Sequence, residues 1–198
     1  MGPARRCTTV RAVEIVADNY RFRRHEVAYL AARPWIRGAT VLEAGAGEGY
    51  GADILSRVAR RVIAVDPDAA ACEYAAKAYP GLTVTRANLT ELPIADGSVE
   101  AVVSLQTVHR LADRPGFVAE CARVLRSAGT LVVSTPNSGE VDLPDLLAPH
   151  FRVDRLYGVH PRRRLRRRNP ATVSHRDFHF AENTTDDALD LFAIAIRI

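Results

Sequence analysis

Two kinds of segment follow one another along the chain, and they differ in the spacing of their apolar residues. Short runs such as RVIAVD at 61–66 are almost continuous in apolar residues, which is typical of strands buried on both faces. Other segments repeat apolar residues at i, i+3/i+4 and i+7, which indicates helices. The clearest case is 114–126, with Phe117, Val118, Cys121 and Val124.

The two spacings alternate from residue 39 to 159, and one more apolar run ends the chain. They predict strands over 39–45, 61–66, 82–87, 99–105, 129–136, 151–159 and 191–198. They predict helices over 51–59, 68–80, 114–126 and near 143–149. The stretch 161–190 has too little pattern to place. Strands and helices in alternation favour a parallel sheet covered on both faces. We therefore expect an α/β, Rossmann-like, doubly wound fold, with a mostly parallel seven-stranded sheet, an antiparallel last strand and helices on both faces.

Composition adds limits to this picture. The chain has 198 residues, 47% apolar and 25% charged, as expected of one globular domain. No segment reaches the ~20 apolar residues of a membrane span, and the first residues lack the apolar core of a secretory signal. Cys7, Cys72 and Cys121 are far apart and show no metal-ligand spacing. We expect a cytoplasmic protein without a metal site.

The net charge of +4 comes from one short stretch. Residues 162–168, RRRLRRR, hold six arginines, and the rest of the chain has 21 basic against 23 acidic residues. Such a stretch can attract phosphate, nucleic acid or an anionic lipid surface, but a flexible solvated loop is the favoured interpretation. No aromatic residues interleave with it, so binding of single-stranded nucleic acid is not favoured.

A loop rich in glycine joins the first predicted strand to the first helix. In VLEAGAGEGYG, glycines occupy positions 45, 47, 49 and 51. Glycine permits tight turns and close approach of a ligand to the backbone. The dinucleotide pattern G-x-G-x-x-G would need glycine at Tyr50 or Ala52, so NAD is only weakly favoured. The spacing instead suits a smaller zwitterionic ligand whose amino-acid part lies along the glycines.

Polar residues also stand at the next two strand ends. Asp66 ends the second strand, where a carboxylate can accept hydrogen bonds from both hydroxyls of a ribose. Asn88 ends the third, where an amide can bind the edge of a base. Together with the glycines, these positions predict a nucleoside site at the carboxyl edge of the sheet.

From about residue 20 to 137, the chain resembles class I S-adenosylmethionine (SAM)-dependent methyltransferases of type 11. The resemblance is carried by four segments in order: VLEAGAGEGYG, AVDPD, ANLTELPIADGSVEAVVSLQ and ECARVLRSAGTLVVSTPN. The leading segment NYRFRRHEVAYL, at 19–30, resembles actinobacterial sugar or polysaccharide O-methyltransferases. The resemblance implies SAM as cofactor. It places the amino-acid portion of SAM along Glu43, Gly45, Ala46 and Gly47, and the ribose at Asp66 and Pro67. It places adenine at Asn88 and Leu89, and Gln106 at the wall formed by the fourth strand.

The resemblance also divides the chain. We expect one domain, with a leading helical lid at 1–37, a SAM-binding core at 38–137, and an acceptor side at 138–198 that includes the basic loop 161–170. Related enzymes usually insert a substantial loop after the position of Asn137, and here it is short. The site is then open to a large substrate, completed by a second subunit as in a homodimer, or no longer active.

Methyl transfer from SAM is an in-line displacement, and a base is needed when the acceptor is a hydroxyl. His109, just after the fourth strand, and His25, on the leading segment, are the candidate catalytic residues. The predicted function is methyl transfer to a small-molecule or saccharide hydroxyl. The alternatives are a non-catalytic SAM-binding protein or partner subunit, and an RNA methyltransferase that uses the arginine stretch.

Overall fold

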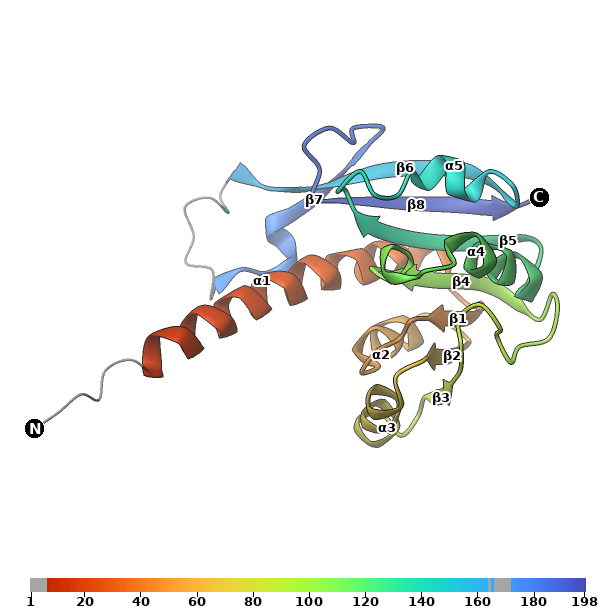
Figure 1. Ribbon diagram of the computed structural model, residues 1–198, viewed down its shortest axis with the longest axis horizontal. Helices are drawn as coiled ribbons and strands as arrows, with labels where there is room; N and C mark the ends of the chain where they lie inside the picture. The colour runs from red at the N-terminus through yellow and green to blue at the C-terminus, as the bar shows by residue number, and fades with distance from the viewer. Residues whose placement is uncertain (1–6, 164, 166–171) are drawn as a thin grey trace, which may run out of the picture.

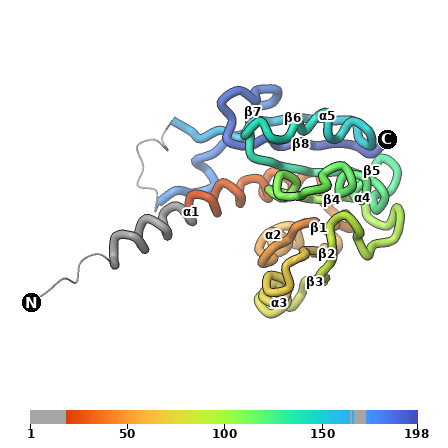
Figure 2. Tube along the Cα trace, in the orientation of Figure 1, coloured from red at the N-terminus to blue at the C-terminus, as the bar shows by residue number. Residues whose placement is uncertain are grey.

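The computed structural model describes residues 7–163, 165 and 172–198, with side chains from Asn19 onward. One open sheet runs through it, with helices on both faces (Figures 1 and 2). The strand order is β3-β2-β1-β4-β5-β8-β6-β7. The strands are β1 (Thr40–Ala44), β2 (Arg61–Asp66), β3 (Thr83–Arg86), β4 (Val99–Leu105), β5 (Leu125–Pro136), β6 (Phe151–Pro161), β7 (Phe178–Glu182) and β8 (Asp190–Arg197).

The helices largely fill the connections between these strands. The α-helices are α1 (Cys7–Ala32), α2 (Tyr50–Ser56), α3 (Ala69–Ala78), α4 (Arg114–Val124) and α5 (Leu143–Leu147). The 3-10 turns with bounds inside the described ranges are η1 (Arg33–Trp35), η2 (Val108–Arg110) and η5 (His175–Asp177). No helix among the described residues combines the length and apolar character needed to cross a membrane.

The predicted fold class is confirmed, with one correction to the strand count. Neighbours among β1 to β5 pair in parallel, and β8 pairs antiparallel with both β5 and β6. Within the residues that the structure describes, the sheet has eight strands rather than the expected seven, because β7 pairs antiparallel with β6 at the edge. This strand lies in the stretch that the sequence pattern could not place.

Alternation along the central strands sends side chains into two separate cores. On β1, Val41 packs in the core beneath α1 and α2, while Leu42 packs in the core beneath α4 and α5. On β4, Val103 packs in the core beneath α1 and α2, and Val102 packs in the core beneath α4 and α5. All four are fully buried. A strand buried on both faces needs apolar residues at every position, which explains the continuous apolar runs.

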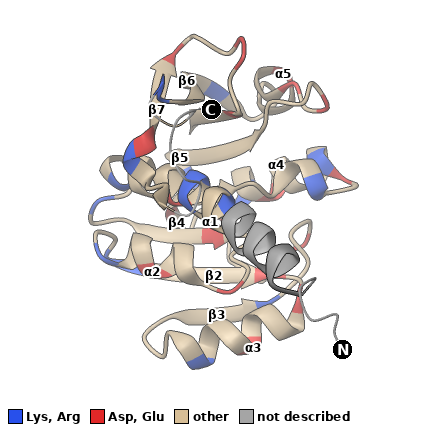
Figure 3. Cartoon of the chain, turned by 90° about the vertical axis from the view of Figure 1, so that its left-hand side faces the viewer, with Lys and Arg blue, Asp and Glu red and all other residues tan. Residues whose placement is uncertain are grey.

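The order of the central strands reverses between β1 and β4. The chain passes from β1 outward to β2 and β3, then returns to the other side of β1 as β4. In open α/β sheets, a crevice for ligands opens at this point, outside the carboxyl ends of the strands. Helix α1 lies across these ends, as seen in Figure 3, and it contacts α2, β4 and η5.

Candidate functional site

A crevice of about 740 Å³ opens at the carboxyl ends of β1, β2, β4 and β5. Its volume lies in the range of small-ligand sites. The wall opposite the sheet comes from one face of α1. The α1 residues that line it follow helical spacing: Arg21, Arg24, His25, Ala28 and Tyr29.

Two glycines after β1 shape the floor of the crevice. Gly45 has φ +88°, and a Cβ there would lie 2.3 Å from Thr107 Oγ1. Gly47 has φ +53°, and a Cβ there would meet nothing within 4 Å. Both line the crevice together with Ala46. The backbone therefore carries no side chain at either position. At Gly45 the side chain of Thr107 fills the space, whereas at Gly47 the space is open.

Asp66 is held in one orientation at the end of β2. Its Oδ2 accepts a hydrogen bond from Gly47 N at 2.8 Å, and its Oδ1 accepts one from Asp68 N at 2.8 Å. Each carboxylate oxygen can accept a second bond. Asp66 and Pro67 both line the crevice. The carboxylate is thus fixed by backbone donors while it keeps acceptor capacity for a ligand.

Glu43 lies beneath the glycine loop rather than in the crevice lining. It is 1% exposed, and neither carboxylate oxygen makes a hydrogen bond of good geometry with the protein. Burial raises the pKa of Glu43 to about 8, although the nearby Tyr29 hydroxyl acts to lower it. The structure therefore holds a protonated carboxyl beneath the loop at neutral pH.

The two residues expected at an adenine ring occupy different positions. Leu89 is 2% exposed and lines the crevice. Asn88 is exposed and outside the lining, and its Oδ1 accepts hydrogen bonds from Thr90 N and Thr90 Oγ1 at 3.1 and 3.0 Å. Asn88 thus stabilises the turn that places Leu89.

Gln106 connects the ends of β4 and β5. Its backbone has φ +57°, a conformation that L residues rarely adopt. Its N–H donates to Ser134 O at 3.0 Å, and its side-chain Nε2 lies 3.3 Å from Ser134 Oγ. Both residues line the crevice. Backbone strain of this kind is found most often at functional sites.

His25 lies on α1, with Nδ1 hydrogen-bonded within the protein and Nε2 buried without a hydrogen bond of good geometry. Nδ1 hydrogen-bonds the Tyr50 hydroxyl, whose pKa burial raises far above its usual value. Burial lowers the pKa of His25 to about 4, against a raising effect of the Leu105 carbonyl. A neutral ring that accepts from Tyr50 at Nδ1 carries its proton on Nε2, towards Leu105. The imidazole therefore stays neutral and fixes Tyr50.

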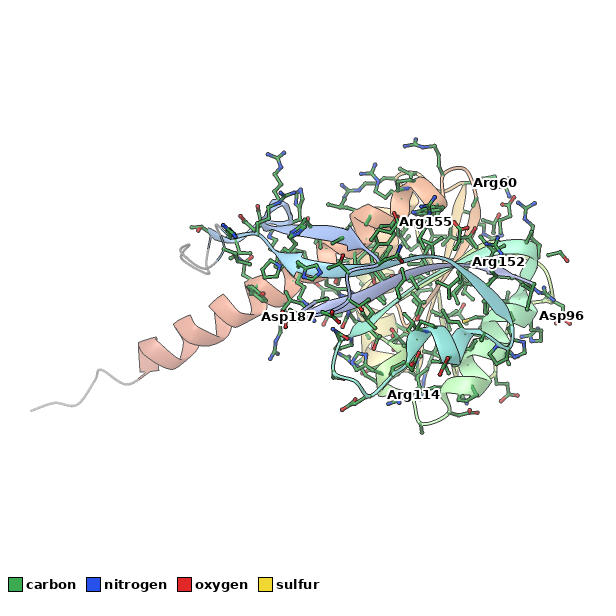
Figure 4. The ribbon with its side chains drawn as sticks, turned by 90° about the horizontal axis from the view of Figure 1, so that it is seen from above. Arg60, Asp96, Arg114, Arg152, Arg155 and Asp187 are labelled. Atoms are coloured by element: carbon green, nitrogen blue, oxygen red, sulfur yellow. The ribbon has the colours of Figure 1, made fainter. Side chains whose placement is uncertain are left out.

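His109 is placed differently, on η2. Its Nδ1 is buried without a hydrogen-bond partner, and the residue lines the crevice. Burial, with the positive charge of Arg110, lowers the pKa of His109. Arg114, labelled in Figure 4, donates to the His109 carbonyl at 3.0 Å and to the Glu140 carbonyl at 2.9 Å. The turn is therefore anchored by Arg114, while the buried Nδ1 makes no hydrogen bond with the protein.

A buried ion pair between distant parts of the chain was not predicted. The guanidinium of Arg24 hydrogen-bonds both carboxylate oxygens of Asp190, 166 residues away, and donates to the Leu189 carbonyl at 2.8 Å. Asp190 is 4% exposed, and both residues line the crevice. The helical spacing of polar residues on 21–29 is the only sequence signal for this wall.

Two further predictions concern charge and metal. The arginine stretch 162–168 lies outside the described residues except for Arg162, Arg163 and Leu165. Within the described part of the chain, no group of three or more His, Cys, Asp or Glu side chains is placed to hold a metal ion.

Comparison with known proteins shows similarity to methyltransferases over the middle of the chain. Residues 42–133 match the family described as Methyltransferase domain. The chain is 53% identical over 120 residues to a "probable S-adenosylmethionine-dependent methyltransferase" of Mycobacterium tuberculosis, covering 61% of this chain and 44% of that protein. A similarly described protein of Mycolicibacterium smegmatis is 49% identical over 123 residues, covering 62% and 48%. The chain thus spans about half the length of these curated relatives.

Solved structures show the same fold. A SAM-dependent methyltransferase of Thermotoga maritima, described as a possible histamine N-methyltransferase, superposes with a TM-score of 0.71 at 18% identity, covering 96% of each chain. A Haloferax volcanii methyltransferase, solved with the Trm112 methyltransferase activator, gives 0.66 at 18% identity, covering 96% of this chain and 94% of that one.

Proposed function

We propose that this chain, which carries a class I SAM-dependent methyltransferase domain, transfers a methyl group to a hydroxyl of a small-molecule or saccharide acceptor. The cofactor of this family is SAM, whose positively charged sulfur supplies an activated methyl group. The acceptor, and the activity of the whole protein, are our proposal.

The crevice offers groups that fit SAM. Gly47 leaves open space where a side chain would otherwise project, so the amino-acid part of SAM can approach the backbone. The oriented Asp66 carboxylate keeps acceptor capacity for two ribose hydroxyls. Leu89 offers an apolar surface for adenine. In this proposal, Glu43 and Asn88 support the loop and the turn without touching the cofactor.

His109 is the observation that carries the proposal. The imidazole lines the same crevice, and because its Nδ1 is buried without a protein partner, we assign the contact with the acceptor to Nε2. Since its pKa is lowered, the ring is neutral at pH 7 and can accept a proton. With SAM bound, the methyl group would pass from sulfur to the acceptor oxygen and leave S-adenosylhomocysteine, and His109 would take the hydroxyl proton.

The other crevice residues orient the reactants in this scheme. Gln106 and Ser134 fix the wall at the end of β4, and His25 fixes Tyr50. Helix α1 acts as the lid that keeps water from the reacting atoms. We also propose that the protein is cytoplasmic and that a second subunit completes the short acceptor side.

The test is a methyl-transfer assay with labelled SAM over a panel of hydroxyl acceptors. His109→Ala should lower kcat by about 10²–10⁴-fold, the usual contribution of a general base, while SAM affinity stays unchanged. In the wild type, the rate should fall as the pH drops through the lowered pKa of His109, because the protonated ring cannot accept a proton. His150→Ala, outside the crevice lining, is the control.

Two results would contradict the proposal. Full activity in His109→Ala would show that His109 is not the base. Tight SAM binding without transfer to any acceptor would favour a non-catalytic SAM-binding protein instead.

A further inference from the structure

Two arginines in the crevice have no acidic partner among the described residues. Arg21 comes from α1 and Arg110 from η2, and both are exposed side chains in the crevice lining. No ion pair joins either of them to a described carboxylate. By contrast, Arg23 and Arg24, which follow Arg21 on α1, are paired with Glu26 and Asp190. Arg21 and Arg110 are therefore available to a ligand.

The acidic residues of the crevice do not compensate for these two charges. Asp190 is 4% exposed and is bound by Arg24 on two oxygens. Asp66 and Glu48 belong to the cofactor side, where Asp66 is oriented by Gly47 and Glu48 follows in the glycine loop. The side that faces the acceptor, with Arg21, Arg24, Arg110 and Asp190, thus carries a net charge of +2.

Arg110 lies close to the proposed reaction centre. Its positive charge lowers the pKa of both His109 and His25, which line the crevice from different elements. A group bound by Arg110 would therefore lie near the histidine that takes the proton. A guanidinium presents a planar fork of donors that matches a carboxylate or a phosphate.

We propose that the acceptor carries an anionic group, a carboxylate or a phosphate, which Arg21 and Arg110 bind while its hydroxyl faces His109. This inference rests on the proposed function and adds the substrate class. The methyl group and the proton move as described above, and the anionic group itself is not modified.

The experiment compares matched acceptors that differ only in charge. One arm pairs hydroxycarboxylic acids with their primary amides, and the other pairs sugar phosphates with the parent sugars. In the wild type, the anionic member should have a KM at least tenfold lower than its neutral partner. In Arg21→Gln and Arg110→Gln, the KM of the anionic member should rise at least tenfold with a smaller change in kcat. The arm with the larger preference identifies the anionic group.

Arg37→Gln is the matched control. Arg37 is an exposed arginine just before β1, at the opposite end of the strands from the crevice, and the change removes the same charge. Equal KM values for charged and neutral acceptors, or an Arg110→Gln variant that behaves like Arg37→Gln, would overturn the inference.

A binding measurement separates this inference from the proposed function. Protein loaded with S-adenosylhomocysteine is titrated with inorganic pyrophosphate and with citrate, followed by calorimetry. Binding by the wild type and Arg37→Gln, lost in Arg21→Gln and Arg110→Gln, would support an anion site even if no acceptor were methylated. Equal binding by all four proteins would overturn the site while leaving methyl transfer untouched.

Discussion

At the scale of single residues, the loop after β1 shows how two similar glycines serve different purposes. At Gly45, a methyl group would overlap Thr107, and the backbone lies in the left-handed region. At Gly47, the backbone is also left-handed, but a methyl group would enter the open crevice. The first glycine is therefore required mainly for folding, and the second mainly for ligand binding.

Alanine substitutions should separate these two roles. Gly45→Ala should destabilise the fold by about 2–3 kcal/mol, since it adds a steric overlap to the strain of positive φ. Gly47→Ala should cost only about 1 kcal/mol of stability but weaken SAM binding at least tenfold. Urea unfolding and calorimetric titration measure the two effects. Gly81→Ala, with no positive φ and nothing within 4 Å, is the control. Similar SAM affinity in Gly47→Ala and Gly81→Ala would contradict the assignment.

The buried carboxyl of Glu43 should make stability depend on pH. Its pKa is about 8 in the folded state, against 4.5 for an ordinary glutamate. Between these values the folded state holds a proton that the unfolded state releases, so stability falls as pH rises from about 5 to 8. Glu43→Gln removes this effect, and relative to the wild type it should gain stability on the order of 1–3 kcal/mol over that interval. Urea unfolding of SAM-free protein at pH 5.5 and 8 measures the gain. A difference between the two proteins that does not change with pH would disprove it.

At the scale of elements, α1 is joined to the sheet by the buried pair of Arg24 and Asp190. Removing one partner of such a pair leaves a buried charge, which costs about 3–5 kcal/mol, whereas an exposed pair contributes less than about 1 kcal/mol. Arg24→Gln should therefore destabilise the protein by about 3 kcal/mol. Arg23→Gln should cost under about 1 kcal/mol, because Arg23 pairs with Glu26 one turn away and is 36% exposed. Urea unfolding of both variants tests this, and equal losses would show that the Asp190 contact does not hold α1.

The central strands could be predicted because each is buried on both faces, so its apolar run is continuous. The predicted ranges 61–66 and 99–105 coincide with β2 and β4. The edge strand β7 could not be predicted, because FHFAE alternates over only five residues and its pairing with β6 depends on a long connection. A half-buried strand of this length gives too little signal in one sequence.

At the scale of the whole molecule, the two sides of the crevice differ in how far the sequence predicts them. The cofactor side is built from consecutive strand ends, so residues such as Gly47 and Asp66 follow local patterns. The acceptor side joins α1 to β8 across 166 residues, and no local pattern predicts that Arg24 meets Asp190. Asn88 was expected at adenine from its position at a strand end and from the family resemblance, and in the structure its side chain holds the following turn.

The whole fold should gain stability from SAM and not from NAD. A ligand at 100 times its dissociation constant that binds only the folded state stabilises it by about 2.7 kcal/mol. For a domain of this size, each kcal/mol shifts the melting temperature by about 2–4 °C, so saturating SAM should raise it by about 5–10 °C. Thermal unfolding of the wild type and Gly47→Ala, each with SAM or NAD, tests this. The SAM shift should shrink in Gly47→Ala at the same concentration, because the added methyl group occupies the crevice floor. An equal or larger shift with NAD would mean that the loop binds a dinucleotide, since only a ligand that prefers the folded state can raise the melting temperature.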